Sequence, residues 1–287
     1  MIIDNFALTN FQSCPAKYDL RILQHWQSRR KSAALGFGGT FHEGLAEWYR
    51  SGDRAKAMMA LSEAWPQFTP IDDYRTKEKC VSTLIEYFKT YPAETFSIVG
   101  APSNPMVECV FTLDTGLTLD DGEPIEYGGI FDGIVEFGGS VYVLEHKTTS
   151  QLGSTYFNQF KPNNQVTGYT WAAGLLSGKR VGGAIINAIG VFKSSASRFD
   201  RQITTRSQQE IEDWLINVQA TCQQIRDCER RGYWPLYTGS CTMYGRCEYH
   251  DVHILGTPIE RRKRLEQDYE VKQWAHEERS LVKDEGI

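Results

Sequence analysis

The chain has 287 residues, of which 41% are apolar and 23% are charged, and its formal net charge at pH 7 is −5. This length and apolar content predict a substantial buried core, and the absence of a low-complexity tract excludes a largely disordered chain. The negative charge excludes a generally basic surface, so a nucleic-acid enzyme of this composition would need a local basic groove beside an acidic site.

The first hundred residues are predicted to be mostly helical. Thr9 can cap a helix through FQSCPAKYDLRILQHW, and the amphipathic segment FHEGLAEWYRSG predicts a second helix that ends at a glycine. Two further helices are predicted over RAKAMMALSEAW and KEKCVSTLIEYFKTY, the latter ending near Pro92.

After this region the hydrophobic pattern changes to strand lengths and alternation. Three strands are predicted over MVECVFTLD, EYGGIFDGIVEF and SVYVLEHKT, with FGGS as a tight connection between the last two. A helix over NNQVTGYTWAAGLLSG and two strands, over GGAIINAIGVF and near RFDRQITT, follow.

The last third begins with a long helix predicted from about Ser207, a plausible N-cap, to Arg231, with Gly232 ending it. An irregular, cysteine-containing stretch then precedes a charged helix from Pro258 to about Glu278. The order of elements predicts a single α/β domain. Its expected parts are a mostly helical lobe, a catalytic α/β core and a region of helices and metal-binding loop, over residues 1–100, 101–206 and 207–287.

Three charged residues stand in or at the ends of two predicted core strands. Asp132 lies in one strand, and Glu145 and Lys147 close the next. If FGGS makes these strands adjacent and antiparallel, the two carboxylates converge at one edge of the sheet, with Lys147 on the face of Glu145. Such oxygen ligands suit Mg²⁺ or Mn²⁺, and a lysine beside them can orient a water or steady a developing charge. The alternative is an exposed hairpin with a Glu145–Lys147 salt bridge.

This arrangement resembles the PD-(D/E)XK nuclease superfamily and its RecB-like branch, which includes CRISPR-associated and phage exonucleases. GGTFHEGLAEWY resembles the upstream helix of that branch, whose histidine, here His42, also ligates the metal. NNQVTGYTWAAG carries Gln165 and Tyr169 and resembles the Q-x-x-x-Y signature, while FQSCPAKYDLRIL resembles the N-terminal cysteine segment. The matches span roughly residues 9 to 253.

The resemblance implies a restriction-endonuclease-like core, a mixed sheet flanked by helices, with an N-terminal helical lobe and a C-terminal cysteine-containing loop. It implies a metal held by His42, Asp132 and Glu145. The implied catalytic residues are Asp132, Glu145, Lys147, Gln165 and Tyr169. Glu108, in the first strand, is a lower-ranked accessory acid, and His146 is expected on the face opposite Glu145. As alternatives, His42 could be a surface or core residue, and Gln165 and Tyr169 a packing pair one helical turn apart.

Three of the seven cysteines are candidate metal ligands. RecB-like families with an iron–sulfur cluster use one N-terminal and three C-terminal cysteines, two of them separated by five residues. Cys14 and the pair Cys241 and Cys247 resemble that pattern, and His253 stands where some forms have another cysteine. The resemblance implies a Cys₃His site for a 4Fe–4S cluster or, failing that, structural Zn²⁺. The alternative is that these cysteines are ordinary buried thiols.

We therefore expect a metal-dependent DNA exonuclease acting in recombination, repair or phage DNA processing. The alternatives are a structure-specific endonuclease and a non-catalytic nucleic-acid-binding module that retains the fold. Basic residues that could contact the DNA backbone cluster at Arg29–Lys31, Arg198–Arg206 and Arg261–Arg264, with little base specificity expected.

The expected setting is the cytoplasm of a bacterial or phage-infected cell, with a recombination or annealing protein as a possible partner. No signal peptide and no membrane span are predicted, because the N-terminal stretch lacks a basic segment before an apolar one and no apolar run reaches about 18 residues.

Overall fold

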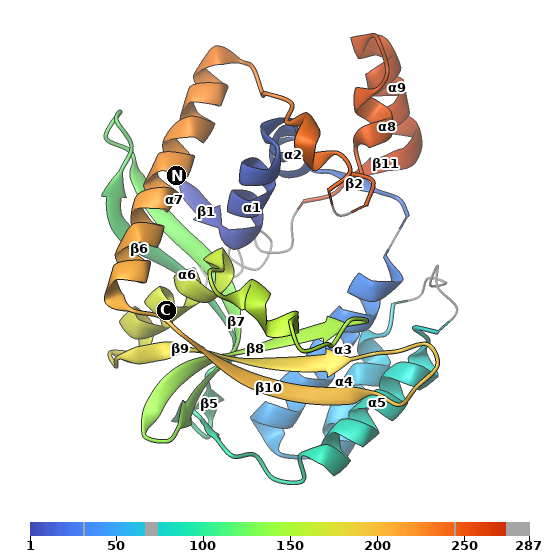
Figure 1. The fold of residues 1–287 in the computed structure, drawn as a ribbon, viewed down its shortest axis with the longest axis vertical. Coiled ribbons are helices and arrows are strands. Elements are labelled where there is room, and N and C mark those ends of the chain that lie inside the picture. Colours follow the sequence, from blue (N-terminus) through green and yellow to red (C-terminus); the bar gives the residue numbers. More distant parts are fainter. Residues whose placement is uncertain (31, 67–73, 244, 274–287) are drawn as a thin grey trace. The chain divides into compact units, whose positions relative to one another are not determined.

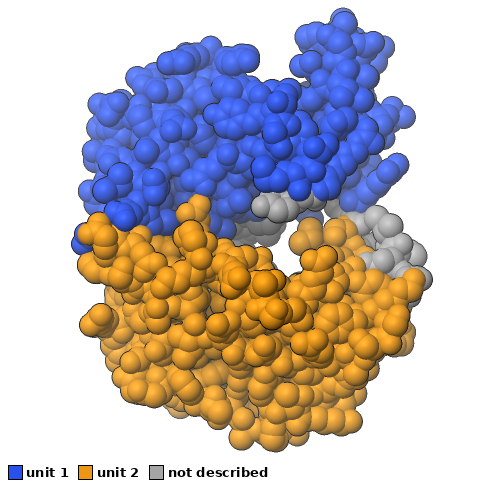
Figure 2. All heavy atoms as spheres, in the orientation of Figure 1, with its two compact units in different colours: residues 1–30, 110–129, 212–287 blue, residues 31–109, 130–211 orange. Residues whose placement is uncertain are grey.

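The computed structural model describes residues 1–30, 32–66, 74–243 and 245–273 (Figure 1). The chain forms two compact units, which Figure 2 shows in different colours. Unit 1 comprises residues 1–30, 110–129 and 212–287, and unit 2 comprises residues 31–109 and 130–211. The expectation of a single domain, with its three parts divided at residues 100 and 206, stays a prediction.

Unit 2 contains the helices that surround the candidate catalytic residues. Their bounds are α3 Ala33–Ser51, α4 Arg54–Ala64, α5 Lys77–Thr90, the 3₁₀ helix η2 Tyr156–Phe160 and α6 Asn164–Ser177. Side-chain oxygens of Ser32, Asp53, Thr76 and Asn163 accept N–H groups in the first turns of the four α-helices, which satisfies donors that have no partner within a helix. Helix α3 ends at Gly52, whose φ of 66° is the left-handed conformation that glycine adopts readily.

A seven-stranded mixed sheet confirms the predicted fold class. Its strands are β1 Ile2–Asp4, β3 Ser97–Ile98, β6 Val107–Thr118, β7 Pro124–Phe137, β8 Ser140–Thr149, β9 Val181–Gly190 and β10 Arg198–Thr205. The main order is β1-β7-β8-β9-β10, and β3 and β6 also pair with β7. Strands β8 and β9 are parallel, whereas β7–β8 and β9–β10 are antiparallel. A short ladder of β4 Gly100–Ala101 with β5 Asn104–Pro105 lies apart from this sheet.

The predicted FGGS turn joins β7 to β8. Phe137 pairs with Ser140, and Gly138 and Gly139 between them have φ of 57° and 77°. Two successive positive φ angles match the right-handed twist of the flanking strands, and two glycines adopt them without steric cost. This turn fixes the register of the hairpin that carries the candidate catalytic residues.

Three helices and a strand form the main apolar core of unit 2. Helices α3, α4 and α5 contribute most of its buried side chains, and β9 contributes Ile189. The members include Phe37, Phe41, Leu45, Leu61, Leu84, Tyr87 and Phe88. This core holds α3 beside the sheet.

Unit 1 contains the N-terminal helices and the last third of the chain. Its other elements are α1 Asn5–Ser13, α2 Pro15–Tyr18, the π-helix η1 Asp19–Leu23, β2 Trp26–Ser28, α7 Gln208–Arg231, η3 Thr238–Ser240, α8 His250–His253, α9 Pro258–Asp268 and β11 Tyr269–Val271. Helix α7 begins in one unit and continues in the other. As predicted, Ser207 accepts the N–H of Glu210 at 3.2 Å, and Gly232 follows the last turn with φ of 61°.

The prediction of one N-terminal helix capped by Thr9 is wrong. Helix α1 begins after Asp4, whose side chain accepts the N–H of Ala7 at 2.7 Å, and Thr9 lies within the helix. The helix ends at Cys14, which has an extended backbone with φ of −168° and ψ of 114°. Pro15 disfavours a helical conformation for the residue before it and starts α2 instead.

The C-terminal helix also ends earlier than predicted. Helix α9 stops at Asp268, and β11 pairs with β2 with Tyr269 opposite Ser28. Tyr269 is buried and stacks on Tyr249 at a ring-centroid distance of 5.4 Å, so strand pairing and burial replace further helix. The predicted part beyond residue 273 lies outside the described residues. Among the helices in the described part of the chain, none is long and apolar enough to cross a membrane.

Candidate active site

Asp132 is fixed where the β7–β8 ladder ends. The pairing runs from Phe137–Ser140 to Gly133–Leu144. One step further, the main-chain N–H of His146 donates to Oδ2 of Asp132 at 2.6 Å. Oδ2 of Asp132 therefore accepts a backbone N–H that would bond to the main chain of β7 in a longer ladder. The other oxygen, Oδ1, is left for a partner outside the sheet.

His42 reaches this carboxylate from helix α3. A Cβ on Gly38 would lie 3.0 Å from Oγ1 of Thr148, so the glycine permits the close approach of α3 to β8. One turn later, Nδ1 of His42 lies 3.3 Å from Oδ1 of Asp132. Burial lowers the pKa of His42, because it disfavours the charged imidazole. The charge of Asp132 and its hydrogen bond to His42 together have the larger effect and raise this pKa to about 9. Burial also opposes ionisation of Asp132, but His42 and the N–H of His146 hold the pKa of that carboxyl well below its usual range.

Glu108 completes a close set of three ligand-type side chains. One ligand atom each of His42, Glu108 and Asp132 lies within 4.8 Å of the other two. Glu108, in strand β6, has φ of 52°, which is rare for a residue other than glycine. Burial, and then the charge of Asp132, raise the pKa of Glu108 to about 7. The set therefore places a second acid beside the ion pair of His42 and Asp132, on a strained backbone at Glu108.

Glu145, Lys147 and Gln165 form a second group. Nζ of Lys147 lies 2.6 Å from Oε1 of Glu145 and donates to Oε1 of Gln165 at 3.0 Å. Nε2 of Gln165 donates to the same Glu145 oxygen at 3.0 Å. Burial lowers the pKa of Lys147, but the Glu145 carboxylate raises it above its usual value, so the ammonium stays charged. Burial raises the pKa of Glu145.

Two further features complete this side of the site. Oε2 of Glu145 is buried and has no hydrogen-bond partner among the described residues. The hydroxyl of Tyr169 accepts the N–H of Ile130 at 3.5 Å, and its ring packs on Phe131 at 5.2 Å. The hairpin and helix α6 thus bring together Asp132, Glu145, Lys147, Gln165 and Tyr169, but Glu145 is outside the close set of His42, Glu108 and Asp132.

His146 lies on the opposite face of β8 from Glu145, within a buried polar network. Nδ1 of His146 and Nδ2 of Asn187 lie 2.9 Å apart, and Nε of Arg201 donates to Oδ1 of Asn187 at 3.0 Å. Two Arg201 nitrogens contact Glu94 at 2.5 and 3.0 Å. Burial lowers the pKa of His146 to about 3, so the ring is neutral and accepts from Asn187 at Nδ1. The ring also stacks on Tyr49 at 5.6 Å.

Comparison with known proteins identifies the family of this chain. Residues 6–252 match the PD-(D/E)XK nuclease superfamily. The chain belongs to this superfamily. Membership supports a hydrolytic nuclease, a class that typically uses divalent metals, and His42, Glu108 and Asp132 are a group that could hold one.

A solved structure shares the fold of this PD-(D/E)XK chain. It is a candidate exonuclease from Eubacterium rectale, with a TM-score of 0.55, 12% identity, and 90% coverage of each chain. A second structure, of the protein SSO0001, has 16% identity and covers 66% of this chain and 74% of its own, but its TM-score of 0.29 supports no argument. No curated protein matches the sequence significantly.

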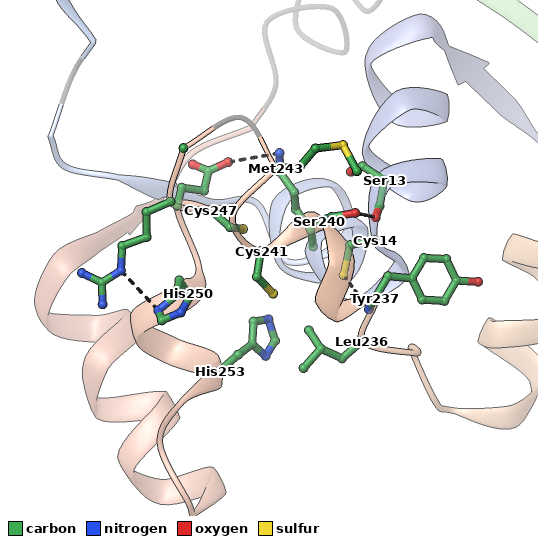
Figure 3. A pocket seen from close by; sticks show the side chains of 14 residues that line it. Ser13, Cys14, Leu236, Tyr237, Ser240, Cys241, Met243, Cys247, His250 and His253 are labelled. Atoms are coloured by element: carbon green, nitrogen blue, oxygen red, sulfur yellow. Dashed lines mark hydrogen bonds and ion pairs between the residues drawn. The ribbon is translucent and has the colours of Figure 1, made fainter.

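The predicted cysteine ligands of this PD-(D/E)XK chain lie around one hollow in unit 1. The cavity has a volume of about 280 Å³, and Cys14, Cys241, Cys247 and His253 are among its lining residues. Figure 3 shows their side chains gathered around this space. No three of their ligand atoms lie within 4.8 Å of one another in the described structure.

Two local features organise this hollow. The break between α1 and α2 presents Cys14, whose sulfur accepts the N–H of Tyr237 at 3.4 Å. The N–H of Cys247 donates to the carbonyl of Cys241 at 2.9 Å, which closes the loop between them. Nε2 of His253 is buried and has no partner among the described residues. Cys80 and Cys222, by contrast, are fully buried away from this group.

Several arginines of the predicted basic clusters already bind other side chains of the protein. Arg201 and Arg206 are bound within unit 2, the latter donating to Oγ1 of Thr167 at 2.7 Å. Within Arg261–Arg264, Arg262 pairs with Glu266 at 2.7 Å and Arg264 with Asp268 at 2.8 Å. Of the cluster at Arg29–Lys31, the last residue lies outside the described residues.

Proposed function

We propose that this chain is a metal-dependent deoxyribonuclease that hydrolyses DNA phosphodiester bonds, acting as an exonuclease. The observation that carries the proposal is the close set of His42, Glu108 and Asp132, together with the Glu145–Lys147 pair on β8, the strand next to the one that bears Asp132. Burying carboxylates beside a lysine costs desolvation free energy, and such groups gather at catalytic and binding sites.

The residues fit a divalent cation. The close set offers two carboxylates and an imidazole within 4.8 Å, and oxygen-rich sets of this kind suit Mg²⁺ or Mn²⁺. The buried Oε2 of Glu145, which has no partner among the described residues, is a further candidate ligand atom. We assign the metal to His42, Asp132, Glu145 and, in addition, Glu108. When bound there, the cation would polarise the phosphodiester and lower the pKa of a water.

The chain's own residues supply positioning and charge. Lys147 is held by Glu145 and Gln165 with its ammonium charged, so it can orient the attacking water and steady the developing negative charge of the phosphate. Gln165 bridges the two charged side chains, which fixes the rotamer of each. Tyr169, on the same helix face one turn later, is assigned to contact the substrate phosphate.

The exonuclease assignment draws on membership of the superfamily and on the fold shared with a candidate exonuclease. Its setting would be recombination, repair or phage DNA processing. The chain retains all three residues of the catalytic pattern, Asp132, Glu145 and Lys147. This complete set disfavours the alternative of a non-catalytic binding module.

End-labelled linear DNA and covalently closed circular DNA of the same sequence test this proposal. With Mg²⁺ or Mn²⁺, the linear substrate should lose its end label progressively while the closed circle persists. Equal rates on both would reject the exonuclease in favour of an endonuclease, and no hydrolysis of either with either metal would reject the nuclease.

We also propose that Cys14, Cys241, Cys247 and His253 bind a 4Fe–4S cluster or, failing that, structural Zn²⁺. Three thiols, a buried imidazole nitrogen and an N–H···S hydrogen bond around one cavity support a metal site.

A further inference from the structure

A second hollow lies on the face of the sheet that carries Glu145. Glu145 is opposite Ile186 on β9, and Ile186 is opposite Gln202 on β10. Ile186 and Gln202 both line a cavity of about 400 Å³. Neighbouring strands are about 4.8 Å apart, so Gln202 lies two strands, roughly 10 Å, from Glu145. The hollow therefore lies close enough to the candidate catalytic residues for a neighbouring nucleotide of the same substrate.

One wall of this hollow is aromatic and firmly anchored. Phe157 and Phe160, from the 3₁₀ helix η2, line it, and both pack against Tyr156 at ring-centroid distances of 5.3 and 5.6 Å. The carbonyl of Phe160 accepts Nη2 of Arg206 at 2.5 Å and Oγ1 of Thr204 at 3.3 Å. These bonds tie the aromatic wall to the end of β10, and Phe157 is only partly buried.

The other wall is polar and has no acid. Asn158, Lys161, Gln202 and Thr204 line it, and none of the described lining residues is a carboxylate. The side-chain amides of Asn158 and Gln202 have no hydrogen-bond partner among the described residues, and both residues are exposed. A partly exposed aromatic ring, two amides and a lysine match the chemistry of a nucleobase with its phosphate. Lys161 also pairs with Glu210, which does not line the hollow, at 3.9 Å, and both side chains of this pair are solvent-exposed, so a phosphate can compete for the ammonium.

We propose that this hollow binds one unpaired base of the DNA strand whose phosphodiester lies at the active site. The inference rests on the proposed function and specifies its substrate as single-stranded at this point. A base within a duplex is covered by its neighbours on both faces, so only an unstacked base can place a face on Phe157. Gln202 and Asn158 bond the edge of the base, and Lys161 contacts the adjacent phosphate.

The test measures binding of a fluorescein-labelled oligothymidylate and of a labelled duplex by anisotropy, with Ca²⁺ in place of Mg²⁺. The variants are Phe157→Ala, which removes the stacking face, and Gln202→Glu, which introduces a carboxylate at an exposed position. The control is Leu175→Ala, since Leu175 is 55% exposed on α6 of the same unit. Removing a stacked base contact should weaken oligothymidylate binding roughly tenfold. Duplex binding should change by less than about twofold, and the control should match the wild type.

Oligothymidylate affinities of both variants equal to that of the wild type would overturn the assignment, as would equal losses on single-stranded and duplex DNA. Hydrolysis by the wild type is measured on the same preparations. A wild-type protein that hydrolyses DNA beside variants that bind normally refutes only the base site. A wild-type protein that hydrolyses no DNA refutes the proposed function on which this inference rests.

Discussion

The N–H of His146 and the carboxylate of Asp132 lie 2.6 Å apart, while the other oxygen of Asp132 faces His42 at 3.3 Å. One carboxylate is therefore oriented by a strand of the sheet and by a helix at once. This arrangement fixes the position of Asp132 before any metal binds, and it couples metal binding to the protonation of His42.

Metal affinity should rise with pH. His42 has its pKa raised from 6.5 to about 9, so in the metal-free protein it is protonated at neutral pH. Its ion pair with Asp132 stabilises the metal-free fold fully below pH 6.5, and that contribution is lost as pH rises through about 9. A ligating imidazole must be neutral, so Mn²⁺ displaces this proton and binds about tenfold more tightly per pH unit between pH 7 and 9. Calorimetry in buffers of different ionisation enthalpy measures the released proton.

The matched variant is His42→Ala, which should bind Mn²⁺ more weakly and lose most of this pH dependence. Its nuclease activity should recover partly at higher Mn²⁺ concentration. An unchanged metal dependence combined with a lower melting temperature would instead assign His42 to packing.

The buried pair of Arg201 and Glu94 should be important for stability. Both side chains are 13% exposed, and removing one partner leaves a charge without compensation. Glu94→Gln should lower the free energy of unfolding by about 3 kcal/mol. The double variant Glu94→Gln, Arg201→Met should be more stable than Glu94→Gln alone, because it removes the orphaned charge. Urea unfolding of the wild type, Glu94→Gln, Arg201→Met and the double variant measures this, and additive losses from the two single variants would show that the pair is not coupled.

The cysteine site should be independent of the catalytic carboxylates. Cys241→Ser should lose bound iron, or zinc, and melt at a lower temperature, because metal–thiolate bonding contributes directly to folding. Asp132→Asn should retain the metal of the cysteine site, since Asp132 belongs to the other compact unit. Elemental analysis and thermal melts of anaerobically purified protein test this. If neither metal is found and Cys241→Ser melts like the wild type, the cysteines are ordinary thiols.

Local sequence patterns predicted the hairpin that carries the candidate catalytic residues. The two glycines of FGGS specify a tight turn, the turn fixes the register, and the register puts Asp132 beside Glu145. The helical spacing of Gln165 and Tyr169 likewise predicted a shared face on α6.

Interactions distant in sequence could not be predicted in the same way. Arg201 looked like part of a basic cluster, but it pairs with Glu94, 107 positions away. From the sequence, Glu108 is equally well explained as an exposed strand glutamate, and its positive φ has no sequence signal of the kind that glycine gives. The break at Cys14 did have a signal in Pro15, which the helical pattern around it obscured.

The most direct measurement of the central claim is single-turnover hydrolysis of end-labelled linear DNA by Lys147→Ala and Glu145→Gln, at saturating Mg²⁺ and with circular dichroism confirming the fold. If Lys147 and Glu145 act at the reacting phosphate, each variant should hydrolyse DNA about 100-fold or more slowly than the wild type. The matched control Lys179→Ala, which removes an exposed lysine that pairs with Glu136 at 3.6 Å, should hydrolyse at the wild-type rate. Wild-type rates for both Lys147→Ala and Glu145→Gln would contradict the claim that these residues form the active site.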